Sequence, residues 1–302
     1  MSSHSSLNHI YRTVWNQALG AMVAVAEISS GRGRSGGASK RSRLACKHDL
    51  QALKALGLLS LGIALAWGAM VPQARANPNG AVAVHGQANM VSQGKQLTVT
   101  TQNGAGTNHS AINWQSFSIP AGNTTYFQQP NALSTVINRV VTNTPSQIFG
   151  TLGSNGHLVL VNQSGIAVGA GALVDTAGFT ASTLRMSDAD ALAGRLRFGD
   201  GSAGAGLSVE GSILARSGDV VLLGSSVETG KDALVQTPNG ATILVAGSAV
   251  SISARGLEGI NFEVQAPTDA AVNLGTLKGD AIGIFAGTLK HSGAIQATRA
   301  SL

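Results

Sequence analysis

Short apolar runs that end at glycine, asparagine or serine recur along the chain, most densely over residues 145–184. In this stretch IFGTL is followed by a break at residues 153–156, HLVLV by one at 162–165, and IAV by one at 169–171. Runs of this length, with corners that tolerate a positive φ, are typical of strands joined by tight turns. No helical period of 3.6 residues persists for more than one turn. The pattern therefore predicts β-structure that turns often and repeatedly.

Beyond Thr180 the apolar and polar residues alternate, which places the apolar side chains of each segment on one face. The alternating segments are residues 207–210, 250–253, 262–265, 272–274 and 282–284. With the apolar runs at 220–223, 234–236, 242–247 and 295–298, they recur about every ten residues. Two strands with their corners would fill a coil of roughly 20 residues in an all-β parallel solenoid. An immunoglobulin-like sandwich has similar spacing, but small aliphatic residues, Gly and Asn corners and the lack of helical crossovers favour the solenoid.

Two parts of the pattern depart from the repeat. Strands expected at 81–85, 96–101 and 111–119 precede the regular region and would form a cap over its first coil. Residues 187–206 interrupt the repeat as an excursion, with a helical turn expected at 189–194. Trp114 and Phe117 could form a platform for a carbohydrate or fill the core of the cap. We favour the core for this pair, and likewise for Tyr126 and Phe127, because large aromatic residues dominate burial in a chain with 4% aromatics.

The charge is concentrated in a leader over residues 1–76. This part holds nine Lys/Arg and two Asp/Glu, whereas the other 11 Lys/Arg and 12 Asp/Glu give residues 77–302 a net charge of −1. The leader, expected to be helical or disordered, carries an uncharged apolar run at 55–71 and small residues at Ala74 and Ala76. This order predicts a Sec signal peptide cleaved after Ala76 rather than a membrane anchor. The nearly neutral remainder argues against nucleic-acid binding.

The residues that carry chemistry are few and scattered. The only cysteine, Cys46, lies in the leader, so neither a disulfide nor a catalytic thiol is expected after cleavage. His85, His109, His157 and His291 lack metal-ligand spacing, and Asp188 with Asp190 is more typical of a solvated loop than of a calcium site. We predict no catalytic, cofactor or metal site, although β-helix enzymes that cleave polysaccharides remain a third functional possibility.

Two stretches resemble a known family. The leader sequence NHIYRTVWNQALGAMVAVAE resembles the extended signal peptide of very large Gram-negative secreted proteins. INWQSFSI and the 145–184 segment resemble the two-partner secretion, or haemagglutination activity, domain of filamentous haemagglutinin-type exoproteins. Together with the leader, the tail from EVQAPTDAAVNLG onward is most similar to the high-molecular-weight adhesin branch. The resemblance implies a right-handed, single-stranded parallel β-helix over 77–302, with an N-terminal cap and a small antiparallel extra element.

The resemblance also implies a route and partners. The chain would cross the inner membrane through the Sec translocon, lose its leader to signal peptidase, and be recognised by an outer-membrane β-barrel transporter with periplasmic domains. At the cell surface it would mediate adhesion or haemagglutination, and so virulence, through a host receptor or glycan. The same module could instead belong to a haemolysin or to a contact-dependent growth inhibition toxin. We expect either a piece of a longer adhesin or an unusually short member.

The family's secretion motif, Asn-Pro-Asn-Gly, marks the candidate recognition residues. By its place in the strand pattern, the motif falls on Asn162, Gln163, Ser164 and Gly165, where the two central residues differ. The unaltered tetrad occurs at the expected cleavage point as Asn77, Pro78, Asn79 and Gly80. Each tetrad could be a docking contact for the transporter or an ordinary type I turn.

Overall fold

A computed structural model describes residues 11–16, 21–26, 77–199, 205–263 and 270–301, and divides the chain into two compact units, Met1–Ala69 and Met70–Leu302. In the first unit β1 (Tyr11–Asn16) pairs antiparallel with β2 (Ala21–Ala26). The expectation of helix or disorder is wrong for these two segments. Their aromatic and β-branched residues favour strands. The apolar run at 55–71 and the cleavage residues Ala74 and Ala76 lie outside the described residues.

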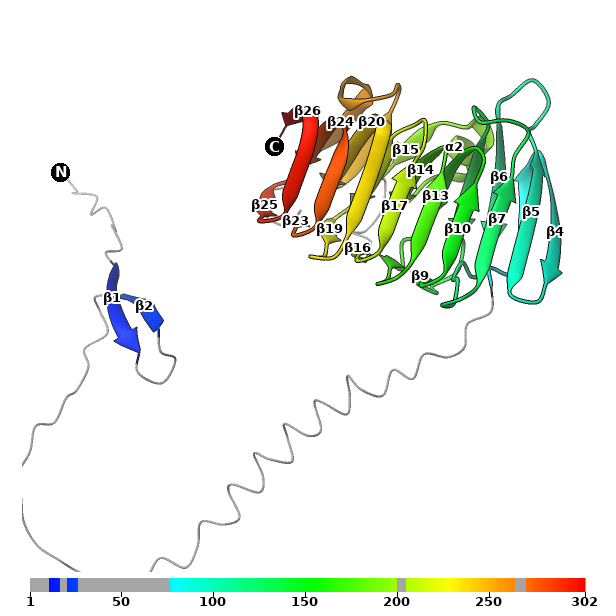
Figure 1. Ribbon diagram of the computed structural model, residues 1–302. Helices are drawn as coiled ribbons and strands as arrows, with labels where there is room; N and C mark the ends of the chain where they lie inside the picture. The colour runs from blue at the N-terminus through cyan, green and yellow to red at the C-terminus, as the bar shows by residue number, and fades with distance from the viewer. Residues whose placement is uncertain (1–10, 17–20, 27–76, 200–204, 264–269, 302) are drawn as a thin grey trace, which may run out of the picture. The chain divides into compact units, whose positions relative to one another are not determined.

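The second unit is a parallel β-helix built from three ladders of strands (Figure 1). The first ladder comprises β5 (Gln96–Gln102), β7 (Thr124–Gln128), β10 (Thr151–Ser154), β13 (Leu173–Thr176), β17 (Ser212–Ala215) and the first halves of β20 (Leu234–Ala246), β24 (Thr276–Phe285) and β26 (Ala294–Ser301). The second comprises β6 (His109–Trp114), β8 (Thr135–Val140), β11 (His157–Val161), β14 (Gly178–Ser182), β18 (Val220–Gly224) and the second halves of β20, β24 and β26. The third comprises β9 (Ser146–Ile148), β12 (Ile166–Val168), β16 (Leu207–Val209), β19 (Ser226–Thr229), β23 (Ala270–Asn273) and β25 (Thr288–His291).

A regular coil is 22 residues long and contributes one strand to each ladder. Thr151 lies beside Leu173, and Ser212 beside Leu234, each one coil further along the chain. The sequence analysis predicted a coil of about 20 residues but only two strands. Several third-ladder strands were predicted individually, among them β12, β16 and β23, but at three or four residues they are too short to show that they form a separate third ladder.

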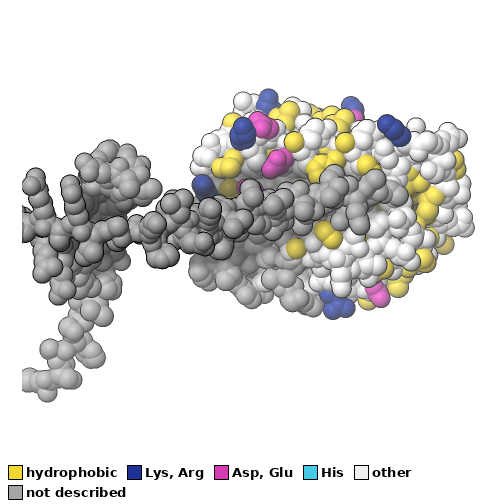
Figure 2. All heavy atoms as spheres, turned by 90° about the horizontal axis from the view of Figure 1, so that it is seen from below, with side chains coloured by type: hydrophobic (Ala, Val, Ile, Leu, Met, Phe, Trp, Pro, Cys, Tyr) yellow, Lys and Arg dark blue, Asp and Glu magenta, His cyan; other side chains and the backbone are white. Residues whose placement is uncertain are grey.

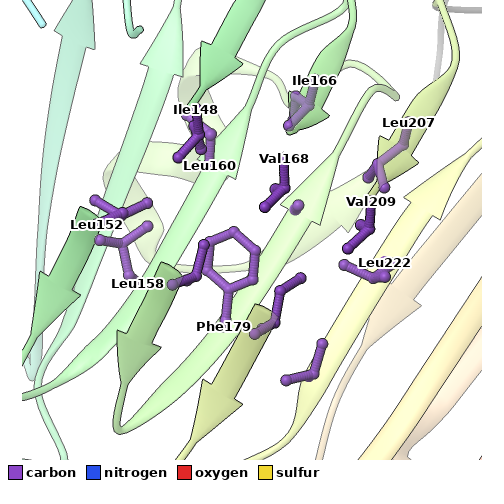
Figure 3. Close-up of a cluster of buried hydrophobic side chains, with 14 of the residues drawn as sticks. Ile148, Leu152, Leu158, Leu160, Ile166, Val168, Phe179, Leu207, Val209 and Leu222 are labelled. Atoms are coloured by element: carbon purple, nitrogen blue, oxygen red, sulfur yellow. The ribbon is translucent and has the colours of Figure 1, made fainter. Parts of the chain in front are cut away.

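The inside of the coils is a dry core of aliphatic side chains from all three ladders. Leu158 and Leu160 of β11 point inward and stack in register on Phe179 and Ala181 of the next coil. Figure 3 shows Phe179 at the centre of this cluster, with Leu152 and Val168 approaching from the other two ladders. Each coil buries its apolar face only against neighbouring coils, so the core extends along the helix axis.

Strands in the middle of the second ladder are buried on both faces. The alternate residues Val159, Val221 and Ile243 point outward, yet they belong to a second apolar cluster. Two excursions from the coils cover this outer face, and they supply Ala191, Phe198, Val250 and Ile260 to the cluster. Burial on both faces explains why HLVLV, VVLL and TILVA read as continuous apolar runs rather than as alternation.

The two excursions fold together as the antiparallel extra element. The first contains α2 (Asp188–Ala193), which begins after the N-cap Ser187 and ends at Gly194, and β15 (Leu196–Phe198). The second contains β21 (Ala249–Ile252), η1 (Leu257–Gly259) and β22 (Ile260–Glu263). The strands form an antiparallel sheet in the order β15-β21-β22. In the described part of the chain, no helix has the length and apolar character needed to cross a membrane.

This sheet confirms the excursion at 187–206 and corrects two other predictions. The segments at 250–253 and 262–265 were predicted as strands of the repeat, but Val250 and Phe262 pair with each other outside the coils. A period of two is the same for a strand of either kind, so the pattern could not separate them. Asp188 and Asp190 lie in the first turn of α2 rather than in a loop.

The first coil is capped, but only the segment at 81–85 of the three predicted cap strands belongs to the cap; the segments at 96–101 and 111–119 are strands of the first coil itself. β3 (Val82–His85) pairs antiparallel with β6, and β4 (Gln87–Gln93) pairs antiparallel with β5. Trp114 is fully buried there and packs edge-on against Phe117 and Phe127, with ring centroids 5.5 and 6.4 Å away. Its indole N–H donates to Oδ1 of Asn138 over 2.9 Å. Core filling, rather than a carbohydrate platform, is therefore the role of this aromatic group.

Candidate functional site

The turn at residues 162–165 joins β11 to β12 and is held by the side chain of Asn162. The Asn162 Oδ1 atom accepts a hydrogen bond from the backbone N–H of Ser164, and its Nδ2 donates to Thr144 O and Ser146 Oγ, all at 2.9 Å. Asn162 is 1% exposed, so these bonds replace all its contact with water. Asn162 therefore fastens its turn to the preceding coil.

Of the other three residues of this turn, Gly165 acts through its backbone, whereas Gln163 and Ser164 form the tip. Gly165 donates its N–H to Asn162 O over 3.1 Å and has φ +110°, a conformation that favours glycine. Gln163 is exposed and Ser164 half-buried. The backbone oxygen of Gln163 accepts from the N–H of Ala205, at the end of the first excursion, over 2.9 Å. The Gln163 side chain thus forms the exposed tip of this turn.

The tetrad at residues 77–80 begins the cap and is anchored at its start. Asn77 Nδ2 donates to Lys95 O over 3.3 Å, while Asn77 Oδ1 accepts from Asn123 Nδ2 over 3.0 Å. Pro78 is buried, and Asn79 and Gly80 are exposed. Gly80 has φ +65°, and a Cβ there would come within 2.5 Å of the Gln115 side chain. As at the other turn, two residues anchor the tetrad and the rest face solvent.

A chain of hydrogen bonds places Asn79 and Gly80 on the same corner of the β-helix as the second tetrad, where the second ladder passes to the third, while Asn77 is bonded to Lys95 and Asn123 at the start of the first ladder. Asn79 forms a backbone bridge with Ser116 just after β6, its N–H donating to Ser116 O over 3.0 Å. One coil on, Thr142 Oγ1 donates to Gln115 O over 2.6 Å. The next coil brings Asn162, which is bonded to Thr144 O. Neighbouring coils are about 4.8 Å apart, so three steps separate the tetrads by about 14 Å.

This corner presents a narrow strip of uncharged residues, and Arg139, Arg185 and Asp188 line a hollow beside Val141 and Gln163. We name as the corner strip its exposed residues Asn79, Gly80, Gln115, Val141, Thr142, Asn143 and Gln163. All but Val141 and Gly80 carry amide or hydroxyl groups, which can both donate and accept hydrogen bonds. Figure 2 shows one face of the molecule, on which charged side chains occur only as isolated spots. Sequence reasoning marked the two tetrads but missed Gln115 and residues 141–143, which carry no motif and belong to the strip only through the stacking of the coils.

Two of the four histidines come together, which their spacing did not predict. The rings of His85 in β3 and His109 in β6 stack with centroids 4.2 Å apart and planes at 14°. Gly104 and Gly194 lie against the two outer ring faces, where an added Cβ would come within 2.7 Å of a ring atom. Nε2 of His109 donates to Leu192 O in α2 over 3.0 Å. Burial lowers the pKa of His109, and the neighbouring His85 lowers it further.

This histidine pair joins the cap, the first coil and the first excursion. Rings stacked face to face do not direct their nitrogens at a common point, as a metal site requires. Among the residues that the structure describes, no three His, Cys, Asp or Glu side chains are grouped so as to hold a metal ion.

Comparison with known proteins establishes the family. The TPS secretion domain family matches residues 74–301, and the family "Extended Signal Peptide of Type V secretion system" matches residues 8–56. The chain belongs to the TPS secretion domain family. It is exported through the periplasm and the outer membrane to the cell surface or the medium. A domain of this family implies a cognate outer-membrane transporter.

Relatives support the adhesin branch of this family. The crystal structure of the HMW1 secretion domain from Haemophilus influenzae is 32% identical with a TM-score of 0.67, and the match covers 74% of this chain and 59% of that one. Two heme/hemopexin-binding proteins of Haemophilus influenzae are 36% identical over 129 residues and 37% identical over 78, or 42% and 26% of this chain. The matches span only 14% and 8% of those two relatives. The matched families are secretion modules and not enzyme families.

Proposed function

We propose that the corner strip is the surface by which the exported chain docks on the periplasmic domains of its transporter. The observation that carries the proposal is the placement of Asn79 and Gly80 on one corner with the second tetrad, although 81 residues lie between Gly80 and Asn162. Asn77, Pro78, Asn162 and Gly165 hold the turns. Asn79 and Gln163 are exposed, and their side-chain amides have no hydrogen-bond partner among the described residues, so they would make the contacts.

The composition of the strip also predicts how the complex behaves. A strip of amide and hydroxyl groups binds through hydrogen bonds and one apolar contact at Val141, which is 55% exposed. Salt screens charges but has little effect on such contacts. Binding of the purified periplasmic domains to the chain should therefore change little between low and physiological salt. A steep loss of affinity with salt would contradict the proposed surface.

Paired variants test the docking role directly. The double variant Asn79→Ala and Gln163→Ala removes two exposed amides without touching the bonds of Asn162. Gln128→Ala is the matched control, because Gln128 is also exposed but belongs to the first ladder. We expect the double variant to lose about tenfold in affinity for the periplasmic domains, roughly two lost hydrogen bonds. Less of the chain should then reach the medium. Normal export and affinity of the double variant would contradict the proposal.

The leader indicates the earlier steps of the export route. We propose entry through the Sec translocon and cleavage by signal peptidase after Ala76, which separates residues 1–76 from the domain at 77–302. N-terminal sequencing of the exported chain should begin at Asn77. A different first residue would move the boundary and would show whether the Asn77 tetrad survives processing.

Beyond secretion, we propose a non-enzymatic surface adhesin that binds a host receptor or glycan, in line with the likeness to the HMW1 secretion domain. The relatives named heme/hemopexin-binding protein favour a second candidate, an exoprotein that captures a haem carrier. Cells that export the protein should bind epithelial monolayers under the first proposal. They should bind immobilised hemopexin under the second.

A further inference from the structure

The outer face of the extra sheet carries a row of three polar residues in register. Arg197 of β15 lies beside Ser251 of β21, which lies beside Asn261 of β22. Their neighbours Phe198, Val250 and Ile260 belong to the apolar cluster beneath. Because side chains alternate between the two faces of a strand, the polar row faces away from that cluster.

Two hollows lie beside this row, and Arg197, Ser251 and Asn261 line both of them. One has a volume of about 490 Å³ and is also lined by Arg185, and the other has a volume of about 650 Å³ and is also lined by Arg195 and Arg255. The only described carboxylates that line them are Asp190 in the first and Asp219 in the second. Four arginines thus face two acidic residues. We call this surface the arginine groove.

The two carboxylates are already engaged, which leaves part of the positive charge uncompensated. Asp190 accepts from Ser187 Oγ over 2.6 Å and from Arg195 Nε over 2.8 Å. Asp219 lies 3.9 Å from Arg255 Nη2 and accepts from the N–H groups of Ala241 and Gly256. Arg185 and Arg197 form no ion pair within 4 Å with any residue that the structure describes, although their charges help to lower the pKa of Asp188 and of Asp190 respectively. These two exposed guanidinium groups are therefore available to an external anion.

We propose that the arginine groove binds a saccharide that carries carboxylate groups. A guanidinium group matches a carboxylate with two parallel hydrogen bonds, which makes Arg197 the anchor. The hydroxyl of Ser251 and the amide of Asn261 can donate and accept, as the hydroxyl groups of a sugar require. Strands about 4.8 Å apart give the row a length of about 10 Å, which suits a disaccharide.

This inference rests on the proposed adhesive role, and it uses residues distinct from the corner strip. The exported chain, labelled with a fluorophore, is applied to an array of acidic and neutral glycans. A trimer of galacturonate is then titrated in solution, with its methyl ester as the uncharged probe. We expect retention on carboxylate-bearing glycans and binding of the free trimer but not of the ester. Failure to retain any carboxylate-bearing glycan, or equal binding of the ester, would overturn the proposal.

Two variants that each remove one positive charge test where the trimer binds. Arg197→Gln should weaken binding of the trimer about tenfold, the loss of one charged hydrogen-bonded pair. Lys231→Gln removes another exposed cation, outside the groove, and should leave binding unchanged. Equal loss in both variants would indicate non-specific attraction and overturn the site. A glutamate-rich peptide that competes better than the trimer would overturn the assignment to a saccharide.

Measuring the export of each variant distinguishes a failure of the arginine groove from a failure of the docking proposal. Arg197→Gln should reach the medium at the normal level, whereas the Asn79 and Gln163 double variant should not. The double variant, recovered from the cells and shown to be folded by circular dichroism, should still bind the trimer. If Arg197→Gln is exported and still binds the trimer normally, the groove is refuted while the corner strip stands.

Discussion

At the scale of the residue, Asn162 and Gln163 show how one turn divides its work between fold and surface. Asn162 makes three side-chain hydrogen bonds inside the protein, whereas the Gln163 side chain makes none with the described residues. The family motif has proline at the second position, so the departure to Gln163 alters the exposed tip and keeps the anchor. A partner would thus contact a turn with the anchoring residues of the family motif but a different side chain at its tip.

Restoring the proline should stabilise the domain. Gln163→Pro fixes φ at a turn position where no hydrogen bond of the Gln163 N–H is present in the described structure. The unfolded chain loses freedom, and we expect a gain of about 0.4–1 kcal/mol in the free energy of unfolding. Chemical denaturation measures it, with Gln128→Pro as a contrast that should destabilise strand β7. A loss of stability in Gln163→Pro would show that the turn cannot accept the proline φ.

The stacked pair of His85 and His109 predicts loss of stability in mild acid. Burial lowers the folded-state pKa of His109 below its unfolded value of 6.5, so the unfolded chain binds more protons as the pH falls below that value. The free energy of unfolding should therefore be unaffected by this group above pH 6.5 and should decrease as the pH falls below it. Melting temperatures at graded pH measure the effect. His85→Phe keeps a flat ring and removes one charge, so the decrease should be smaller; in His291→Gln it should be unchanged.

At the scale of the element, the two excursions cover the outer face of the second ladder. Val159, Val221 and Ile243 would face water if β15, β21 and β22 were absent, because these valine and isoleucine side chains point away from the coil interior. The coils and the extra element are thus joined by an apolar interface. The arginine groove depends on that interface for its position.

Phe198→Ala should loosen the extra element more than the coils. Phe198 is 4% exposed, and removing its ring from a buried site costs about 3–5 kcal/mol. Hydrogen exchange should speed up in β15, β21 and β22, while the first-ladder strand β10 stays protected. Leu152→Ala, in the inner core, should instead speed up exchange in the coils around it. Uniform deprotection in Phe198→Ala would mean that the two parts unfold together.

The sequence predicted what depends on local period and composition. Gly and Asn corners with short apolar runs indicated the solenoid, and the break at residues 187–206 indicated the excursion with its helical turn. The strands that contain Val250 and Phe262 were assigned to the coils, because strands of a surface sheet and strands of a coil share the same period of two residues. The corner strip required knowledge of how coils stack, since Gln115, Thr142 and Gln163 become neighbours only when coils of 26 and 22 residues are laid in register. Long-range register, rather than strand identity, was the missing information.

At the scale of the whole molecule, the fold suits a chain that crosses the outer membrane as an extended thread. Each coil packs on its neighbours through local ladders, so coils can form one after another as the chain emerges. Burial of apolar surface contributes about 25 cal/mol per Å², and every added coil would make return of the chain less favourable. The corner strip lies on the first three coils, so docking through it, as proposed, would need only the N-terminal part of the domain.

A break in a later coil should therefore stop export without preventing docking. Leu222→Pro removes a ladder N–H from β18, which is paired on both sides and fully buried, and should block that coil from forming. We expect the variant to bind the periplasmic domains normally, but to remain in the periplasm or trapped with the transporter. Co-precipitation and the secreted fraction measure the two steps. The matched control, Leu289→Pro, lies in the exposed strand β25 and should be exported. Because β18 lies two coils beyond the corner strip, normal export of Leu222→Pro would mean that folding of the coils does not drive the chain outward.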